Sequence, residues 1–304
     1  MNVKKHFDVV IVGGSYSGLA AAMALGRALR KVLVIDSGLP CNRQTPLSHN
    51  FLTHDGKPPN EIANIAKQQV KEYETVEFLN DLVIRSTKTD KGFEIETESG
   101  KSIHTTKLIF ATGIKDEMPS IQGFTECWGI TILHCPFCHG YEVRGVSTGI
   151  LGNGDKGFEF AKLISNWTKN IGIFTNGKSS FTPEQVQKLT HHNIHIDDRE
   201  IRKIVHSEGN IENFVFNDNS KTTIKVLYAP LPFTQHCTLP EQLGCALTED
   251  GYVKTDSMQK TDVYGVFACG DNASRMRTVA NAISMGTTAG MMLNKELIEE
   301  YFTN

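Results

Sequence analysis

The chain has 304 residues, of which 39% are hydrophobic and 21% are charged, a composition that predicts a globular protein of two domains. Its formal net charge of -3 offers no basic surface for nucleic acid or for an anionic membrane. The first residues hold no apolar run long enough for a signal peptide or a membrane span, so we expect a cytoplasmic protein whose substrate binds in a cleft.

The N-terminal region has the pattern of a nucleotide-binding βαβ unit. An apolar strand is predicted at residues 7–12, an alanine-rich helix at 17–29 and a second apolar strand at 31–35. The first strand and the helix are joined by the glycine turn Gly13-Gly14-Ser15-Tyr16-Ser17-Gly18. The backbone N–H groups of such a turn, together with the N-terminus of the helix, can bind a pyrophosphate.

This turn departs from the usual G-x-G-x-x-G motif at one position. Ser15 takes the place of the middle glycine, and its hydroxyl can itself donate to a phosphate, whereas Gly18 permits close packing of the helix. Asp36 ends the second strand, where a carboxylate accepts hydrogen bonds from the ribose hydroxyls of adenosine. For the turn alone an ordinary βα connection is an equally good interpretation, but Asp36 favours a nucleotide.

The next segments predict a hairpin, a strand and a linker. Hairpin strands are expected at residues 81–83 and 93–98. An apolar strand at 108–113 ends in Thr112-Gly113, and residues 114–123 have the composition of a linker.

A second βαβ pattern follows, with strands at residues 147–151 and 171–175 and a helix at 155–167. Its turn, Gly152-Asn153-Gly154-Asp155-Lys156-Gly157, keeps all three glycines of the motif. Two such units predict an α/β chain with two Rossmann-like domains.

A further motif lies near the C-terminus. An apolar strand that starts near Tyr264 ends in Gly270-Asp271 and precedes an apolar helix from about Thr278. This resembles the second FAD fingerprint of flavoproteins with two dinucleotide-binding domains, which implies that Asp271 binds the ribityl chain of the flavin. With Thr112-Gly113 it completes three fingerprints, in the order that such flavoproteins have them. An aspartate that only caps the next helix is the alternative.

The chain contains seven cysteines but only one close pair, in the sequence Cys135-Pro136-Phe137-Cys138-His139. Two thiols at this spacing can form a small disulfide ring, and the pKa of one thiol can be lowered. His139 adds a proton carrier whose ordinary pKa lies near working pH. A thiol, a partner thiol and a base together predict a redox centre. The other cysteines are scattered, and we expect them to be small buried hydrophobes: Cys41, Cys127, Cys237, Cys245 and Cys269.

Haem attachment and zinc binding also use cysteine pairs of this spacing. Cys-x-x-Cys-His is also the haem-attachment pattern of c-type cytochromes, but it requires export, for which no signal is visible. A zinc site would combine Cys135 and Cys138 with His134 or His139, but no second metal-binding pair supplies the remaining ligands. We therefore expect no metal at this site.

With these motifs in one chain, the sequence resembles the low-molecular-weight thioredoxin reductases over essentially its full length. The resemblance implies an FAD-binding domain of residues 1–115 and 223–304, interrupted by an NAD(P)H-binding-like domain of residues 116–222 that carries the cysteine pair. The chain would return to the first domain near residues 221–226. The resemblance also implies a homodimer.

The family pattern assigns roles to the redox residues. In those reductases Cys138 would face the flavin, Cys135 would exchange with the substrate, and the residue after the second cysteine would act as acid and base. That residue is usually aspartate, whereas here it is His139. The run from Cys135 to Glu142 is similar to a branch that includes the dithiol oxidases of gliotoxin and holomycin biosynthesis. His134 is a secondary candidate.

Nicotinamide nucleotide use is not favoured by the second unit. Members that use NADPH carry a His-Arg-Arg run for the 2′-phosphate, where this chain reads Phe174-Thr175-Asn176-Gly177-Lys178. Loss of two arginine contacts, each worth about 1.5–3 kcal/mol, would lower NADPH affinity by about two to four orders of magnitude. Asn176 is neutral where NADH use favours an acidic residue. We expect the second turn to be a retained scaffold.

The sequence therefore predicts an FAD-dependent dithiol–disulfide oxidoreductase that oxidises a small dithiol or a thioredoxin-like protein, with oxygen or another acceptor. An NADPH-dependent thioredoxin reductase is the second interpretation, and a binding protein whose cysteines hold zinc is the third. Asn42, Arg43 and Asn50 lie in a polar stretch where related flavoproteins contact FAD, although a surface loop is equally compatible.

Overall fold

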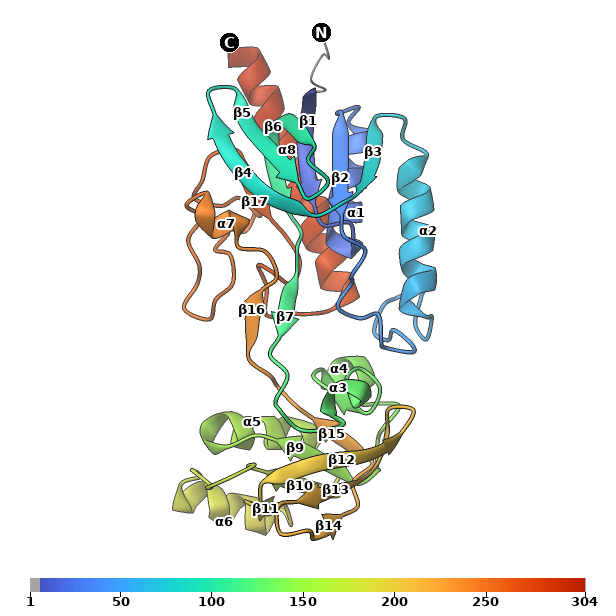
Figure 1. The fold of residues 1–304 in the computed structure, drawn as a ribbon, viewed down its shortest axis with the longest axis vertical. Coiled ribbons are helices and arrows are strands. Elements are labelled where there is room, and N and C mark those ends of the chain that lie inside the picture. The colour runs from blue at the N-terminus through green and yellow to red at the C-terminus, as the bar shows by residue number, and fades with distance from the viewer. Residues whose placement is uncertain (1–5, 304) are drawn as a thin grey trace.

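The computed structural model describes residues 6–303, and within them seven strands form one sheet in the order β3-β2-β1-β6-β5-β4, with β17 paired to β6 (Figure 1). The strands are β1 (His6–Val12), β2 (Val32–Asp36), β3 (Val76–Asn80), β4 (Val83–Thr89), β5 (Gly92–Thr97), β6 (Ser102–Phe110) and β17 (Val266–Ala268). β3, β2, β1, β6 and β17 are parallel, so their carboxyl ends meet at one edge, which faces the rest of the chain.

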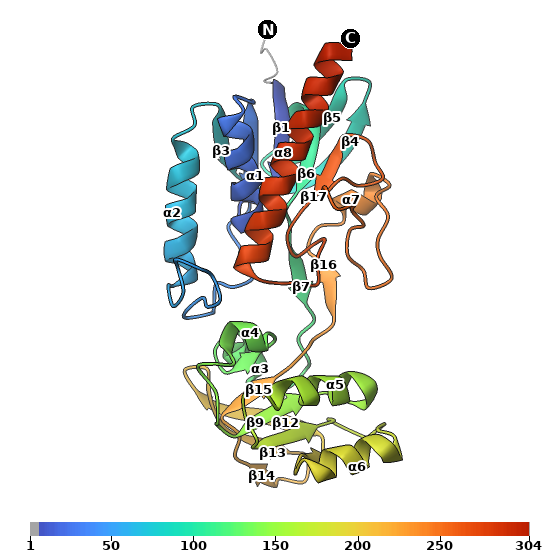
Figure 2. The same cartoon turned by 180° about the vertical axis from the view of Figure 1, so that it is seen from behind.

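Helices cover one face of this sheet, as Figure 2 shows from behind. They are α1 (Tyr16–Arg27), α2 (Pro59–Lys71) and the long α8 (Val279–Thr303). α1 and α8 approach so closely that a Cβ added to Gly286 would lie 2.0 Å from the backbone oxygen of Ser17. On the other face, buried strand residues pack against the segment around α7 (Leu239–Gln242).

A second, parallel sheet has the order β11-β10-β9-β15-β8. Its strands are β8 (Ile132–Leu133), β9 (Thr148–Leu151), β10 (Ile171–Phe174), β11 (His195–Asp197) and β15 (Val226–Tyr228). One face packs on α5 (Gly154–Ile164) and α6 (Pro183–His191), and the other on the antiparallel strands β12 (Ile201–Ser207), β13 (Asn210–Phe216) and β14 (Lys221–Thr222). The predicted α/β chain with two Rossmann-like units, the second inserted into the first, is confirmed.

Two strands connect the units. β7 (Ile114–Asp116) leaves the first unit and pairs antiparallel with β16 (Phe233–Gln235), which returns to it. The expected linker at 114–123 therefore begins as a strand. The return crossing was expected near 221–226, and β15 still pairs there with β8 and β9 of the second sheet.

The hairpin was misplaced in part. The strand expected at 93–98 is confirmed as β5, but its partner is β4 and not residues 81–83, and β3 was not expected at all. β4 has only two buried positions and carries polar and charged side chains toward solvent, so a search for apolar runs passes over it.

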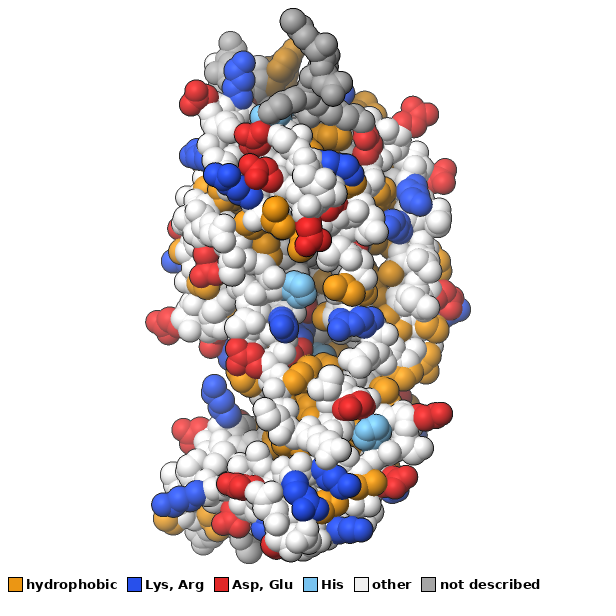
Figure 3. All heavy atoms as spheres, viewed as in Figure 1, with side chains coloured by type: hydrophobic (Ala, Val, Ile, Leu, Met, Phe, Trp, Pro, Cys, Tyr) orange, Lys and Arg blue, Asp and Glu red, His pale blue; other side chains and the backbone are white. Residues whose placement is uncertain are grey.

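On the face seen in Figure 3, acidic and basic side chains are interspersed.

Candidate active site

The first glycine turn is shaped by close backbone contacts. Gly13 has φ +104°, and a Cβ added to Gly18 would lie 1.9 Å from the Gly13 oxygen, so neither position tolerates a side chain. The backbone N–H of Gly14 donates to Oδ1 of Asp36 at 3.1 Å. Ser15 is the N-cap residue of α1, and its side chain makes no hydrogen bond to the first backbone N–H groups of that helix. The helix N-terminus is therefore open to an anion.

The other two fingerprints lie along the same edge of the first sheet. Thr112 follows β6, and its hydroxyl is buried without a hydrogen-bond partner among residues 6–303. Gly270 follows β17 with φ +90°, and a Cβ there would lie 2.5 Å from Oγ of Ser17. Asp271 comes next, and burial raises the pKa of its carboxyl group to about 6, against the opposing effect of Arg277. Buried polar groups without partners at this edge fit a polar ligand.

These features fit FAD, which members of the thioredoxin reductase type bind. The open turn around Gly13 and Ser15 suits the pyrophosphate, and Asp36 suits the adenosine ribose. Asp271 has its carboxylate at the carboxyl end of β17, where a ligand of a parallel sheet is expected.

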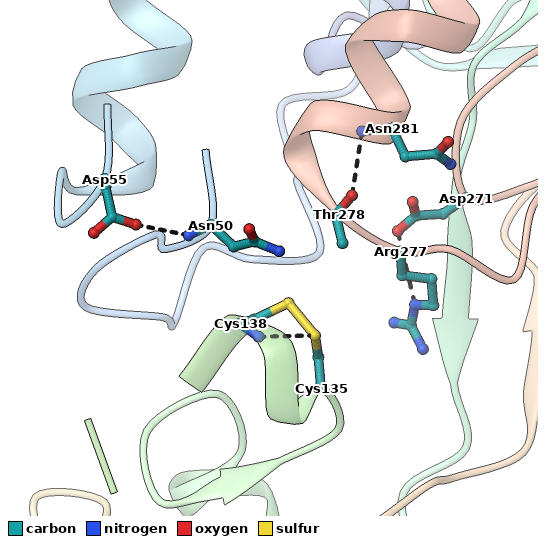
Figure 4. Close-up of a disulfide and its surroundings, with 8 residues drawn as sticks. All are labelled: Asn50, Asp55, Cys135, Cys138, Asp271, Arg277, Thr278 and Asn281. Carbon is teal, nitrogen blue, oxygen red and sulfur yellow. Dashed lines mark hydrogen bonds and ion pairs between the residues drawn. A yellow bond between two sulfur atoms is a disulfide. The ribbon is translucent and has the colours of Figure 1, made fainter. Parts of the chain in front are cut away.

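The cysteine pair forms a disulfide, with 5.3 Å between the Cα atoms of Cys135 and Cys138. It lies on the short helix α4 (Pro136–His139), and the Cys138 N–H donates to Sγ of Cys135 at 3.1 Å. Figure 4 shows the disulfide beside the turn that carries Asp271, Arg277 and Thr278. The disulfide of the second unit therefore faces the candidate flavin edge of the first.

Two histidines flank the disulfide, and burial lowers the pKa of both. The pKa of His139 falls to about 4, first because of burial and second because of nearby His49. The pKa of His134 falls to about 3, again mainly through burial, and its ring stacks on Trp128 with 6.0 Å between centroids. Both rings are neutral at pH 7 and can accept a proton.

The three polar residues after β2 that were expected to contact FAD lie in different surroundings. Asn42 donates through Nδ2 to the Tyr16 hydroxyl at 3.4 Å, and Arg43 is exposed and donates to the backbone oxygen of Pro40. Asn50 has φ 58°, and Figure 4 draws its side chain pointing toward the start of α8. In that view Asn50 lies between the disulfide and the start of α8.

Sequence reasoning missed the most tightly bound ion pair at this site. Arg277 donates from Nη1 and Nη2 to both carboxylate oxygens of Asp116, at 2.8 Å each, and its Nε lies 3.7 Å from Oδ2 of Asp271. The two partners are 161 residues apart in the chain. The available signals were an acidic residue just after the Thr112-Gly113 fingerprint and an arginine just before an apolar helix.

The five cysteines outside the disulfide differ in burial. Cys127, Cys245 and Cys269 are buried as expected, but Cys41 is exposed and Cys237 only half-buried, so the expectation is wrong for Cys41. Within the described part of the chain no group of three or more His, Cys, Asp or Glu side chains could hold a metal ion. No helix in residues 6–303 has the length and apolar character needed to cross a membrane.

The second glycine turn is occupied by the chain itself. Oδ1 of Asn153 accepts from the N–H of Gly154 (2.9 Å), from the N–H of Ser180 (2.8 Å) and from the Ser180 hydroxyl (3.0 Å). Its Nδ2 donates to the backbone oxygen of Lys178 at 2.9 Å. The loop that would bind the adenosine end of a dinucleotide thus folds onto the N-terminus of α5.

Two nucleotide-type sheets with a disulfide between them define an oxidoreductase that works through a redox-active cystine. The chain belongs to the pyridine nucleotide-disulphide oxidoreductase family, which it matches over residues 7–286.

Individual relatives agree with this assignment. The chain is 32% identical to thioredoxin reductase tcpT of Claviceps purpurea (strain 20.1), over 99% of this chain and 97% of that protein. It is 31% identical to thioredoxin reductase sirT of Leptosphaeria maculans, over 95% and 93%. An oxidoreductase from Agrobacterium tumefaciens superposes with a TM-score of 0.90 at 33% identity, over 97% of this chain and 99% of that one. The expected resemblance to thioredoxin reductases is confirmed.

Proposed function

We propose that this enzyme oxidises a dithiol through the Cys135–Cys138 disulfide, with FAD as the electron carrier and oxygen or another acceptor at the end of the route. The observation that carries the proposal is the contrast between the two glycine turns. The first is open beside Ser15, whereas the second has its helix N-terminus bonded to Asn153 and covered by Ser180. If no nicotinamide nucleotide binds at the second turn, the electrons enter from the thiol substrate.

The chemical steps use residues on α4. A substrate thiol gives its proton to His139, and the resulting thiolate attacks Sγ of Cys135. The Cys135–Cys138 bond breaks, and Cys138 leaves as a thiolate with the bonding electron pair. The second substrate thiolate then attacks its own mixed-disulfide sulfur, which releases an oxidised substrate and the Cys135 thiolate. FAD, when bound, accepts two electrons from such a dithiol.

Access to the disulfide supports this route. Phe137 stands between the two cysteines with 63% of its surface exposed, and nearby Tyr141 is 67% exposed. Exposed aromatic side chains beside a reactive centre can contact an apolar substrate or a partner protein. Both a small dithiol and a thioredoxin-like protein are compatible with these exposed side chains.

The second candidate is an NADPH-dependent thioredoxin reductase, which runs in the opposite direction. The names of the relatives favour it, since tcpT and sirT are both called thioredoxin reductase. It requires NADPH to displace Ser180 from Asn153 and to bind without the arginines expected for its 2′-phosphate.

We also propose a division of the chain into an FAD-binding domain and an inserted domain. Residues 1–115 and 223–304 were expected in the first, with 116–222 inserted. The pairing of β15 with β8 and β9 supports an inserted segment that extends to Tyr228.

A cytoplasmic homodimer completes the proposal. Exposed apolar side chains on α8, such as Met291 and Ile298, support a second copy there, which analytical ultracentrifugation can test.

Oxygen consumption with a small dithiol tests the proposed function. The FAD-loaded enzyme is expected to consume oxygen at a rate that depends on dithiol, and Cys138→Ser is expected to keep its FAD but lose this activity. Cys237→Ser is the matched control, because Cys237 packs with the core on the far face of the first sheet. Equal turnover by Cys138→Ser and the wild type would contradict the route.

A further inference from the structure

His49 occupies an unusual position next to the redox centre. It lies in the loop between β2 and α2, in the first unit, yet its ring stands edge-on to that of His139 in the second unit, with 6.4 Å between centroids. Its Nδ1 is 3.5 Å from Oε1 of Glu142 and 3.7 Å from Oδ2 of Asp55. This nitrogen is buried and makes no hydrogen bond to any described residue.

The loop is built to hold His49 in this place. Ser48 and Lys57 form a bridge at its base, where the Ser48 N–H donates to the Lys57 oxygen and the Gly56 N–H to the Ser48 oxygen, at 2.8 Å each. Within the loop the Asn50 N–H donates to Oδ1 of Asp55 at 2.7 Å. The carboxylate of Asp55 is thereby fixed on the side of His49.

The charges around the two rings differ. His49 faces the carboxylates of Glu142 and Asp55, and the ring of His139. The titratable groups that interact with His139 are His49 and His134. A proton on His49 is therefore balanced by carboxylates, whereas a proton on His139 meets only other imidazoles.

The carboxylates also lead outward. The side chain of His49 is 15% exposed, that of Glu142 38% and that of Asp55 66%. A path runs from the half-buried His139 through the mostly buried His49 to two groups in contact with water. The rings of His139 and His49 are neighbours in an edge-on arrangement, so the step between them is short.

We infer that His49 is a positioning residue that relays protons between His139 and the solvent-facing carboxylates of Glu142 and Asp55. The inference rests on the proposed function, since it concerns the proton that the substrate thiol gives to His139. That proton passes to His49 and then through a carboxylate to water, while the electron pair stays with sulfur. His139 returns to its neutral state and is ready for the second thiol.

The relay also couples the two units of the fold. His49 and Asp55 belong to the first, and His139 and Glu142 to the second, so the path is complete only when the disulfide lies against the flavin edge. Glu142 is the last residue of the run from Cys135 that is similar to the dithiol oxidases. In the structure its carboxylate lies beside His49, where it can take part in the relay.

The test follows anaerobic flavin reduction by a small dithiol in a stopped-flow instrument between pH 4 and 9. His49→Gln is expected to slow this step about 10- to 100-fold at pH 7, less than the loss of a direct acid–base catalyst, because His49 acts through His139. His49 is the second cause, after burial, of the low pKa of His139. The acid limb of the profile is therefore expected to move upward from near pH 4 in the variant, but only part of the way to the ordinary histidine range, because burial is unchanged.

Two further variants sharpen the test. Glu142→Gln is expected to slow the same step by a smaller factor, with a larger solvent deuterium isotope effect than the wild type. His54→Gln is the matched control, because His54 lies in the same loop but contacts the ring of Phe51, with 5.5 Å between centroids. Circular dichroism and flavin content confirm that each variant folds and binds its cofactor.

The outcomes separate the two claims. Normal reduction of the wild type together with an unchanged rate and pH profile in His49→Gln would overturn the relay alone. A wild-type enzyme whose flavin no dithiol reduces would overturn the proposed function, and the relay with it. Slower reduction and a shifted profile in His49→Gln, with His54→Gln unchanged, would support the relay.

Discussion

Arg277 holds Asp116 through two parallel hydrogen bonds of 2.8 Å, and so joins β7 to the turn that precedes α8. Both side chains are buried, with 14% and 7% of their surfaces exposed. Because β7 is the strand by which the chain leaves the first unit, this ion pair fixes the exit of the connection next to Asp271.

Breaking this pair should destabilise the protein. Asp116→Asn leaves the buried guanidinium without its full charge partner, so we expect a loss of about 3–5 kcal/mol in the free energy of unfolding. Urea unfolding of the FAD-loaded protein measures it. Arg275→Gln is the control, since Arg275 is 77% exposed and only 3.5 Å from an exposed Asp250. A loss equal to that of the control would show that the buried pair contributes little.

Asp271 makes the stability of the FAD-free protein depend on pH. Its pKa is about 6 in the folded chain, against an ordinary value of 3.8. Between these values the folded chain binds more protons than the unfolded one, so stability falls as the pH rises through that window. Asp271→Asn removes this loss and should make the FAD-free protein more stable than the wild type at pH 7, by roughly 2–3 kcal/mol.

The same substitution should weaken FAD retention, because an amide is a poorer acceptor for the ribityl hydroxyls than a carboxylate. Unfolding of stripped protein at pH 4 and pH 7 checks the first effect, and flavin release during gel filtration checks the second. Equal stability of variant and wild type at pH 7 would contradict the account of Asp271.

His139 sets the expected pH dependence of turnover. Since its pKa is about 4, the ring is neutral at all higher pH and can act as a base there. The acid limb of kcat/KM should lie near pH 4, well below the ordinary histidine range. His139→Ala should lower kcat/KM about 100-fold and remove this limb. A wild-type limb near pH 6.5 would exclude this role for His139.

Asn153 should matter for stability and not for turnover. It caps α5 and makes further bonds to Ser180 and Lys178, so Asn153→Ala is expected to cost about 1–2 kcal/mol in thermal or urea unfolding. Asn166→Ala, at an exposed position beyond the end of α5, serves as the control. Dithiol oxidation should be equal in both variants. A fall in turnover confined to Asn153→Ala would indicate that the second turn takes part in catalysis.

The features that sequence analysis predicted well are local. Gly13, Gly18 and Asp36 lie within one βαβ unit, and Cys135 and Cys138 within one turn of helix, so their spacing alone brings them together. The features it missed depend on tertiary contacts. Arg277 meets Asp116 across 161 residues, and no short pattern records that pairing.

His49 illustrates the same limit in another way. A lone histidine in a polar loop gives no signal in the sequence, and only the arrangement of the two units places it beside His139. β15 lies next to the return crossing, and its three apolar residues do not show from sequence which sheet they join. Local chemistry was therefore predictable, whereas contacts between the units were not.

Electrons are expected to enter this enzyme from a dithiol, and anaerobic titration of the purified yellow protein separates that route from entry through a nicotinamide nucleotide. We predict that a small dithiol bleaches the oxidised-flavin absorbance, that air restores it, and that NADPH and NADH leave it unchanged. Prompt bleaching by NADPH, with no response to the dithiol, would contradict the account and identify the enzyme as a nucleotide-dependent reductase.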